Sequence, residues 1–332
     1  MKKILLTILT LCCLGAYAVS QEAEASENTE TSVNEGVQKD YATMFIPIVN
    51  FKALQTDEKD FVLTPAVNFQ YMRMKNEGVE AKGPDALIIS GGYSTDYFTK
   101  AVGKDEVQFL HNVNLMGNLG FGKNTFVAML ASGGEVPFSS IHVITLGAMY
   151  SRELVKTDNV YFSLGGGIIV ADLGLKIGDF NIYVLPLPVF SLSYQNDIVA
   201  AGLSMTGMPN ASVTLFPKSM FRLNGSVGMA GFSSIRDLTF DCSLSCYPLI
   251  NTAAGDFLSV SGGVMNNVSG FKLKDNTEFG YQYYSVYGEI NATFVTLRGG
   301  YNFNGKNRYD GDEVGDMYKG LFASLQMMYF FQ

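Results

Sequence analysis

Few residues of this chain have the types and spacing that catalysis needs. The chain contains two histidines, His111 in QFLHNVNL and His142 in SSIHVITL. A lipase or protease would place a histidine beside a serine or an acidic group. Ser139 and Ser140 precede His142, but adjacent strand residues point to opposite faces, and His111 shares the apolar face of Phe109. We therefore predict no catalytic residue and no enzyme.

Two further segments contain glycine or acidic residues of the kind that can bind a ligand. The glycine run 165–167 in SLGGGIIV has no lysine or helix after it, so it is not a phosphate loop and instead favours strand bending or close packing. The acidic segment 307–316, NRYDGDEVGD, lacks the spacing of a calcium loop and its glutamate at the twelfth position, so we expect a solvated external loop. We predict no cofactor and no metal site.

Cys242 and Cys246 lie in FDCSLSC. Four residues apart on one strand face, they would be roughly 13 Å apart at about 3.3 Å per residue. A disulfide needs Cα atoms within about 7 Å, so we predict two unpaired, apolar side chains.

Three charged residues are the best functional candidates: Arg222, Asp241 and Arg298. Each alternates with apolar neighbours and therefore lies on the polar face of its strand. If that face lines a barrel lumen, the charges tune the selectivity for ions or solutes. The alternative is that they pair with one another or with neighbours and fill a plugged barrel.

Clean two-residue alternation is what positions these candidates. In FRLNGSVGM, for example, Phe221, Leu223 and Val227 oppose Arg222 and Ser226. Pro186 and Pro188 each remove a backbone donor and mark a bulge or strand end. Sixteen such runs follow one another: 43–54, 61–74, 86–99, 106–120, 125–132, 140–152, 160–175, 181–194, 198–205, 211–216, 220–229, 238–248, 256–265, 278–290, 293–303 and 318–331.

The composition indicates an all-β protein whose outer surface need not face water. Hydrophobic residues make up 47% and charged residues 16%, against about 25% charged in soluble domains. The polar faces carry serine, threonine, asparagine and glycine, and aromatic residues recur near strand ends, as at membrane interfaces. The net charge of −8 argues against nucleic-acid binding. A secreted soluble β-sandwich or adhesin remains the alternative.

A sheet that spans lipid must close, because an open edge would leave backbone groups unpaired in hydrocarbon. We therefore predict a closed antiparallel transmembrane β-barrel with an even number of strands, between 12 and 16 and most simply 14, because runs 125–132 and 211–216 are short. The final strand, LFASLQMMYFFQ, should pair with the first. Segments 266–277 and 304–317 should be external loops, and 195–197, 217–219 and 291–292 periplasmic turns.

The first forty residues read as export and linker segments. Residues 1–18 combine Lys2 and Lys3, an apolar stretch and Ala16-Tyr17-Ala18, which predicts a signal peptide. A retained anchor and lipoprotein processing at Cys12 or Cys13 stay open. Residues 19–40 are acidic and predict a disordered linker, which leaves 41–332 for the barrel.

One stretch resembles a known family. Residues 184–227 contain LPLP followed by Ser193 and Tyr194, then Gly207, Pro209 and Asn210, then Phe216-Pro217. This pattern is similar to uncharacterised outer-membrane β-barrel proteins of diderm bacteria, including spirochaetes and Bacteroidetes. The resemblance covers about a seventh of the chain. It implies a fold and a location, and no substrate.

Together these patterns predict a non-enzymatic, porin-like outer-membrane protein of a Gram-negative cell envelope. It would act as a channel, a transporter or a surface structural protein, with its solute and oligomeric state undefined. Its expected partners are outer-membrane lipid and, during insertion, the barrel-assembly machinery. An outer-membrane barrel enzyme acting on lipid or peptide is the alternative within the same fold.

Overall fold

The computed structural model describes residues 40–56, 60–76, 83–102, 107–172, 176–177, 180–181, 183–230, 238–250, 255–274 and 277–331. The predicted signal peptide and almost all of the predicted linker lie outside these residues. The strand bounds are β1 Tyr41–Gln55, β2 Phe61–Lys75, β3 Ala86–Val102, β4 Val107–Phe121, β5 Asn124–Gly134, β6 Ile144–Lys156, β7 Val160–Val170, β8 Lys176–Ile177, β9 Phe180–Asn181, β10 Val184–Gln195, β11 Val199–Thr206, β12 Met208–Leu215, β13 Phe221–Met229, β14 Leu238–Cys246, β15 Leu258–Lys272, β16 Glu278–Ala292, β17 Val295–Tyr309, β18 Asp312–Asp316 and β19 Gly320–Met328.

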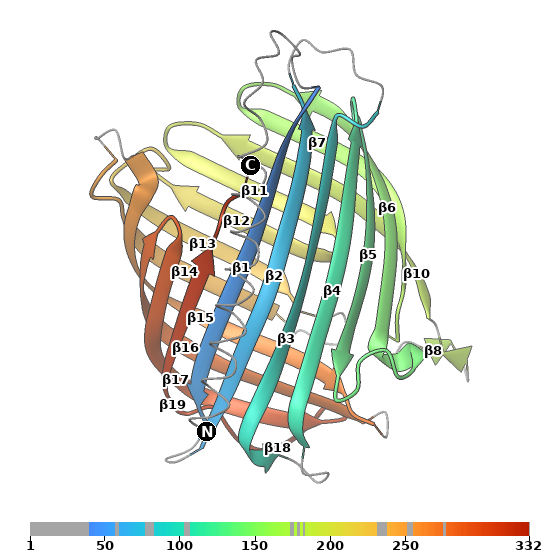
Figure 1. The fold of residues 1–332 in the computed structure, drawn as a ribbon, viewed down its shortest axis with the longest axis vertical. Helices are drawn as coiled ribbons and strands as arrows, with labels where there is room; N and C mark the ends of the chain where they lie inside the picture. The colour runs from blue at the N-terminus through green and yellow to red at the C-terminus, as the bar shows by residue number, and fades with distance from the viewer. Residues whose placement is uncertain are drawn as a thin grey trace, which may run out of the picture. The chain divides into compact units, whose positions relative to one another are not determined.

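Residues 41–332 form one unit, a closed antiparallel barrel (Figure 1). Each barrel strand pairs with the next along the chain, and β19 pairs with β17 and with β1, where Phe51 lies opposite Leu325. The prediction that the last strand closes on the first is confirmed. The described ranges include two 3-10 turns, η1 at Ile141–Val143 and η3 at Gly255–Phe257. Among the described residues, no helix is long and apolar enough to cross a bilayer.

The barrel has sixteen strands, at the upper limit of the predicted range, so the most favoured count of 14 was wrong. The two runs thought too short are both complete strands, β5 and β12. β12 needs only eight residues because Gly207, with φ of 113°, reverses the chain directly after β11. β18 is a short extension that pairs only with β17.

The two ends of the barrel differ. At one, here called the turn end, β1 begins and the connections include 122–123, 157–159, 196–198, 216–220 and 293–294. At the other, the loop end at the bottom of Figure 1, the connections include 135–143, 171–183, 273–277 and 310–319. The proposed external loops at 266–277 and 304–317 were too long, because β15 continues to Lys272 and most of 304–316 belongs to β17 and β18.

The sheet branches near the loop end. The β5–β6 ladder ends at Ser132 and Ile144, and the β14–β15 ladder ends at Asp241 and Met265. Beyond these points β5 and β15 meet each other through a parallel bridge between Gly134 and Lys272. At the loop end, nine strands therefore make a smaller ring: β15, β16, β17, β19, β1, β2, β3, β4 and β5.

Glycine permits two of the close approaches in this sheet. A Cβ on Gly165 would overlap the carbonyl oxygen of Tyr150 on β6, and a Cβ on Gly134 would overlap the carbonyl oxygen of Lys272. The prediction of close packing at 165–167 is thereby confirmed. Pro186 and Pro188 lie within β10 and pair with Ile168 and Gly166 of β7 without a register shift, so the predicted bulge or strand end does not occur there. Their other edge has no ladder, because the pairing with β11 begins at Phe190, so the missing backbone donors are tolerated.

Candidate functional site: the barrel lumen

The inner face of the wall is defined by contacts between strands that are not neighbours. The Lys52 ammonium on β1 donates to the Tyr283 hydroxyl on β16 at 2.8 Å, and the Tyr281 hydroxyl donates to Asp96 on β3 at 2.8 Å. At least two strands separate the members of each pair in the sheet, so these side chains meet inside the barrel. From them the strand registers assign every other inward and outward position.

Outward positions carry exposed, large apolar side chains. Fifteen of the sixteen barrel strands contribute one of the following: Val67, Tyr93, Leu115, Phe126, Leu146, Leu164, Leu192, Leu203, Val213, Leu223, Leu244, Val260, Val286, Leu297 and Leu321. Exposed apolar surface on this scale is not found on soluble monomers, whose largest patches are about 300–600 Å². The outer wall is therefore suited to lipid.

Within the nine-strand ring the lumen is filled. A single buried cluster, called here the filled lobe, contains Leu54, Val62, Phe98, Val107, Leu110, Met265, Phe271, Leu273, Phe279, Tyr281, Tyr283, Tyr287, Tyr309, Met317, Tyr318 and Phe322. All of these residues come from the ring strands or from their loop-end connections. Tyr318, from the segment before β19, is completely buried, with its ring 4.7 Å from that of Tyr281 and 4.9 Å from that of Tyr283.

A cavity of about 330 Å³ adjoins the filled lobe. Its lining includes Lys52 and Asp96, each held by a neutral partner and not by an opposite charge. Asp96 is 8% exposed and accepts hydrogen bonds from the hydroxyls of Thr64 at 2.6 Å and Tyr281 at 2.8 Å. Such charge-assisted bonds compensate for the loss of water around a carboxylate.

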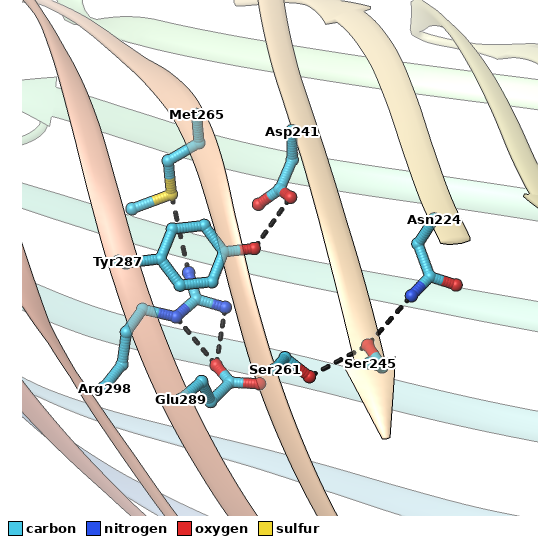
Figure 2. A network of polar contacts seen from close by, with 8 residues as sticks. All are labelled: Asn224, Asp241, Ser245, Ser261, Met265, Tyr287, Glu289 and Arg298. Atoms are coloured by element: carbon cyan, nitrogen blue, oxygen red, sulfur yellow. Dashed lines mark hydrogen bonds and ion pairs between the residues drawn. The ribbon is translucent and has the colours of Figure 1, made fainter. Parts of the chain in front are cut away.

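Two of the predicted lumen charges belong to one network, shown in Figure 2. Arg298 on β17 forms an ion pair of 2.7 Å with Glu289, its direct cross-strand partner on β16. The same guanidinium lies 4.4 Å from the ring centre of Tyr287, whose hydroxyl donates to Asp241 on β14 at 2.8 Å. Arg298 and Asp241 are thus joined through an aromatic ring, and sequence reasoning did not identify Glu289 or Tyr287 as the link.

Arg222, the third predicted charge, lies apart near the turn end. Its guanidinium makes a bidentate ion pair with Asp256 of η3, with hydrogen bonds of 2.8 and 3.1 Å. The guanidinium also lies 3.7 Å from the ring centre of Tyr247. Arg222 therefore fastens the β14–β15 connection. Sequence reasoning did not identify Asp256, which begins the predicted run 256–265 but lies in η3, before β15.

A second wall of the lumen is polar and nearly free of charge. Inward positions of β10–β15, called here the serine wall, carry hydroxyl or amide groups: Ser191, Ser193, Ser204, Asn210, Ser212, Thr214, Asn224, Ser226, Ser243, Ser245 and Ser261. Figure 2 shows Asn224 donating to Ser245 at 3.0 Å and Ser261 donating to Ser245 at 2.8 Å. Thr214 donates to Asn224 at 3.0 Å.

Parts of the inner face are open to water. Asn210 and Ser212 on β12 and Asn112 and Asn114 on β4 are exposed although they face inward. A cavity of about 300 Å³ follows the serine wall at the turn end and is lined by Ser193, Ser212, Thr214 and neighbours. Toward the loop end, the inward residues of β6, β7 and β10 are instead apolar and buried: Met149, Ile169, Leu187 and Val189.

An exposed ion pair joins two turns at the turn end. The Lys218 ammonium lies 2.6 Å from a carboxylate oxygen of Asp197. The hydrogen bond and the positive charge of Lys218 lower the pKa of Asp197 below its ordinary value of 3.8. Both side chains are largely solvent-exposed, so water and salt screen their attraction.

The two histidines lie in different surroundings. His111 faces outward as predicted, between Phe109 and Tyr93, and its Nδ1 is 2.8 Å from the Tyr93 hydroxyl. His142 on η1 has a partner that sequence reasoning missed, because its Nδ1 is 2.6 Å from Asp172 in the β7–β10 connection. Lys272 lies 3.9 Å from the same carboxylate, so these three residues link three loop-end segments.

The described residues do not form a metal site or a disulfide. Among those residues, no group of three or more His, Cys, Asp or Glu side chains could hold a metal ion. Cys242 and Cys246 are free and face outward on β14, which confirms that they are unpaired. The acidic segment 307–316 is largely a β17–β18 hairpin, with Lys306 bound to Asp316 at 2.7 Å. Residues 310–316 are exposed, so the segment is solvated as expected, although most of it is in strands.

Comparison with known proteins gives structural neighbours and no family. No family model matches the chain, and no curated protein matches it. Among solved structures, Pseudomonas aeruginosa OpdQ aligns with 8% identity over 89% of this chain and 99% of its own, with a TM-score of 0.41. A mutant of Rh. blastica porin aligns with 8% identity over 88% of this chain and 100% of its own, with a TM-score of 0.41. Acinetobacter baumannii OccAB4 aligns with 9% identity over 90% of this chain and 100% of its own, with a TM-score of 0.38. Similarities this low assign neither a family nor a function to the chain.

Proposed function

We propose that this protein is a non-enzymatic channel of the bacterial outer membrane that passes small solutes. One observation carries the proposal: the closed wall presents apolar side chains outward on almost every strand, and polar, water-exposed side chains inward on β4 and β12. A bilayer accepts a sheet only when it is closed and its outer face is apolar. A polar, hydrated interior then supplies a route for solutes.

The location and partners are part of the same proposal. The pattern of residues 1–18 supports export, and an outer-membrane barrel would contact lipid and, during insertion, the barrel-assembly machinery. The turn end would face the periplasm and the loop end the exterior, because bacterial barrels have short periplasmic turns and longer external loops. The resemblance of residues 184–227 to outer-membrane barrel proteins agrees with this location.

A barrel enzyme is the second candidate, and one observation favours it. His142 and Asp172 form an acid–base pair at the loop end, where an external lipid or peptide could reach them. The pair also binds Lys272, which neutralises the carboxylate, and the nearest serine on the chain, Ser140, caps η1 through its backbone carbonyl. This arrangement suits a structural clasp better than a nucleophile and its base.

Reconstitution tests the proposal directly. Residues 41–332 refolded in detergent should migrate differently on gels with and without heating, and should produce discrete conductance steps in a planar bilayer. A folded, heat-modifiable barrel without conductance or solute flux would refute the channel and leave a structural role. A chain that stays monomeric in plain buffer would refute the membrane location. Hydrolytic activity lost in His142→Ala would instead establish the enzyme.

A further inference from the structure

The branched sheet divides the loop-end half of the lumen into two parts. The nine-strand ring contains the filled lobe, where fully buried side chains such as Tyr283 and Phe279 occupy the lumen. The Gly134–Lys272 bridge separates this ring from the remaining strands, β6 to β14. A solute that crosses the barrel would therefore travel beside the filled lobe and next to β11 to β14, because β6, β7 and β10 bury Met149, Ile169 and Leu187 toward the loop end.

The serine wall lies on those excluded strands and on the adjoining half of β15. Its eleven side chains are hydroxyls and amides, each able to donate and to accept hydrogen bonds. They are in register across the strands: Ser193 is followed by Gly202, Ser212 and Ser226 on successive neighbours. Only part of their capacity is used within the wall, in the Thr214–Asn224–Ser245–Ser261 chain. Exposed members such as Asn210 and Ser212 can exchange partners with a passing molecule.

Both arginines beside this wall are paired with carboxylates. Arg298 is paired with Glu289, and Arg222 with Asp256. Asp241, the acidic side chain between the serine wall and this network, is hydrogen-bonded by Tyr287 (Figure 2). Paired charges produce weak fields at a distance, so in the network of Figure 2 the Asp241 carboxylate alone adds a net charge, and most of the wall is uncharged. Its chemistry favours solutes that exchange hydrogen bonds with water for hydrogen bonds with hydroxyls.

We propose that solutes cross along the serine wall and that the preferred solutes are small, uncharged and hydroxyl-bearing, such as monosaccharides and polyols. This inference rests on the channel function proposed above. It assigns no role in transport to the filled lobe. The wall acts through many weak, exchangeable contacts, so transport should depend on the surface as a whole.

Thiol modification tests the route. Because Cys242 and Cys246 face lipid, both are first replaced by serine, and Ser212→Cys is then introduced on the wall. The negatively charged reagent methanethiosulfonate ethylsulfonate should lower the conductance of this variant at least about twofold. The matched control is Val213→Cys, whose side chain is 41% exposed on the outer face of the same strand, and its conductance should not change. If Ser212→Cys does not fold, Asn210→Cys presents the same face and serves instead.

Swelling of proteoliposomes tests the solute class. Glucose should enter at least about three times faster than gluconate or glucosamine, which match it in size and carry one charge. Failure of the wild-type protein to conduct ions or pass any solute would overturn the proposed channel and this inference with it. If the wild-type protein conducts, equal entry of the charged sugars, or no effect of the reagent at position 212, would overturn this inference alone.

Discussion

Tyr318 offers a quantitative test of the filled lobe. Its side chain enters the ring from the connection between β18 and β19, is completely buried, and stacks against Tyr281 and Tyr283. Replacing a buried aromatic residue by alanine typically lowers the free energy of unfolding by about 3–5 kcal/mol. Two ring contacts at these distances contribute about 0.5–1.5 kcal/mol each beyond area burial. We therefore expect Tyr318→Ala to destabilise the barrel by about 4 kcal/mol.

The matched control is Tyr318→Phe. It retains both ring contacts and removes a buried hydroxyl that has no hydrogen-bond partner among the described residues, so the expected loss is less than about 1 kcal/mol. Urea titrations in lipid vesicles, followed by the gel-mobility shift and by far-UV circular dichroism, would measure both changes, because the chain has no tryptophan for fluorescence. If Tyr318→Ala and Tyr318→Phe lower the free energy of unfolding by the same amount within about 1 kcal/mol, the β18–β19 connection does not pack into the ring and the filled lobe is incorrectly described.

Three further predictions concern the wall, the lumen charges and the turn end. Gly165→Val should destabilise the barrel by about 1–3 kcal/mol, because its Cβ meets the backbone of β6, whereas Gly166→Ala, with no neighbouring atom closer than 3.9 Å, should be nearly neutral in urea titrations. Arg298→Ala leaves the carboxylate of Glu289 unpaired, so the reversal potential in a planar bilayer should shift toward cation selectivity. An unchanged reversal potential, or a shift toward anion selectivity, would contradict the pairing of Arg298 with Glu289. Replacing Lys218 by methionine should raise the pKa of Asp197 back toward 3.8 in an NMR titration. Because folding lowers the pKa of Asp197, the ion pair stabilises the barrel at pH values above the pKa of Asp197 in the unfolded chain, and this stabilisation is lost as the pH falls through the pKa of the folded state. An unchanged pKa of Asp197 in the variant would exclude Lys218 as the cause.

The closed barrel could be predicted from the sequence because one physical rule controls the whole wall. Lipid outside and water inside impose a period of two on each strand, as in the Phe221–Met229 segment, and all sixteen alternating runs became barrel strands. The counting error arose where a run was short. β12 was doubted because its run, 211–216, is short. The strand begins earlier, at Met208, directly after the single turn residue Gly207, and no polar segment marks that turn in the sequence.

The partners of the candidate charges could not be predicted in the same way. Arg298 and Glu289 are opposite each other only once the register of β16 and β17 is fixed, and Asp241 meets Tyr287 only through the curvature of the sheet. Alternation gives the face of a residue but not its neighbour two strands away. Asp172 and Asp256 were missed for another reason: they lie in the predicted runs 160–175 and 256–265, but β7 ends at Val170 and β15 begins at Leu258, so both belong to connections.

The branch in the sheet has a cause that can be traced to strand length. β15, β16 and β17 have 15 residues each, whereas β11 to β14 have eight or nine. When a long strand follows a short one, its far end loses the neighbour that would satisfy its backbone groups, and such groups are costly once packing removes them from water. β15 loses β14 after Met265, and the Glu135 amide and Gly134 restore a partner at Lys272 from the opposite side of the lumen. The ring closed by that contact is narrow enough for aromatic side chains to fill, which leaves the serine wall of the shorter strands facing the water that remains.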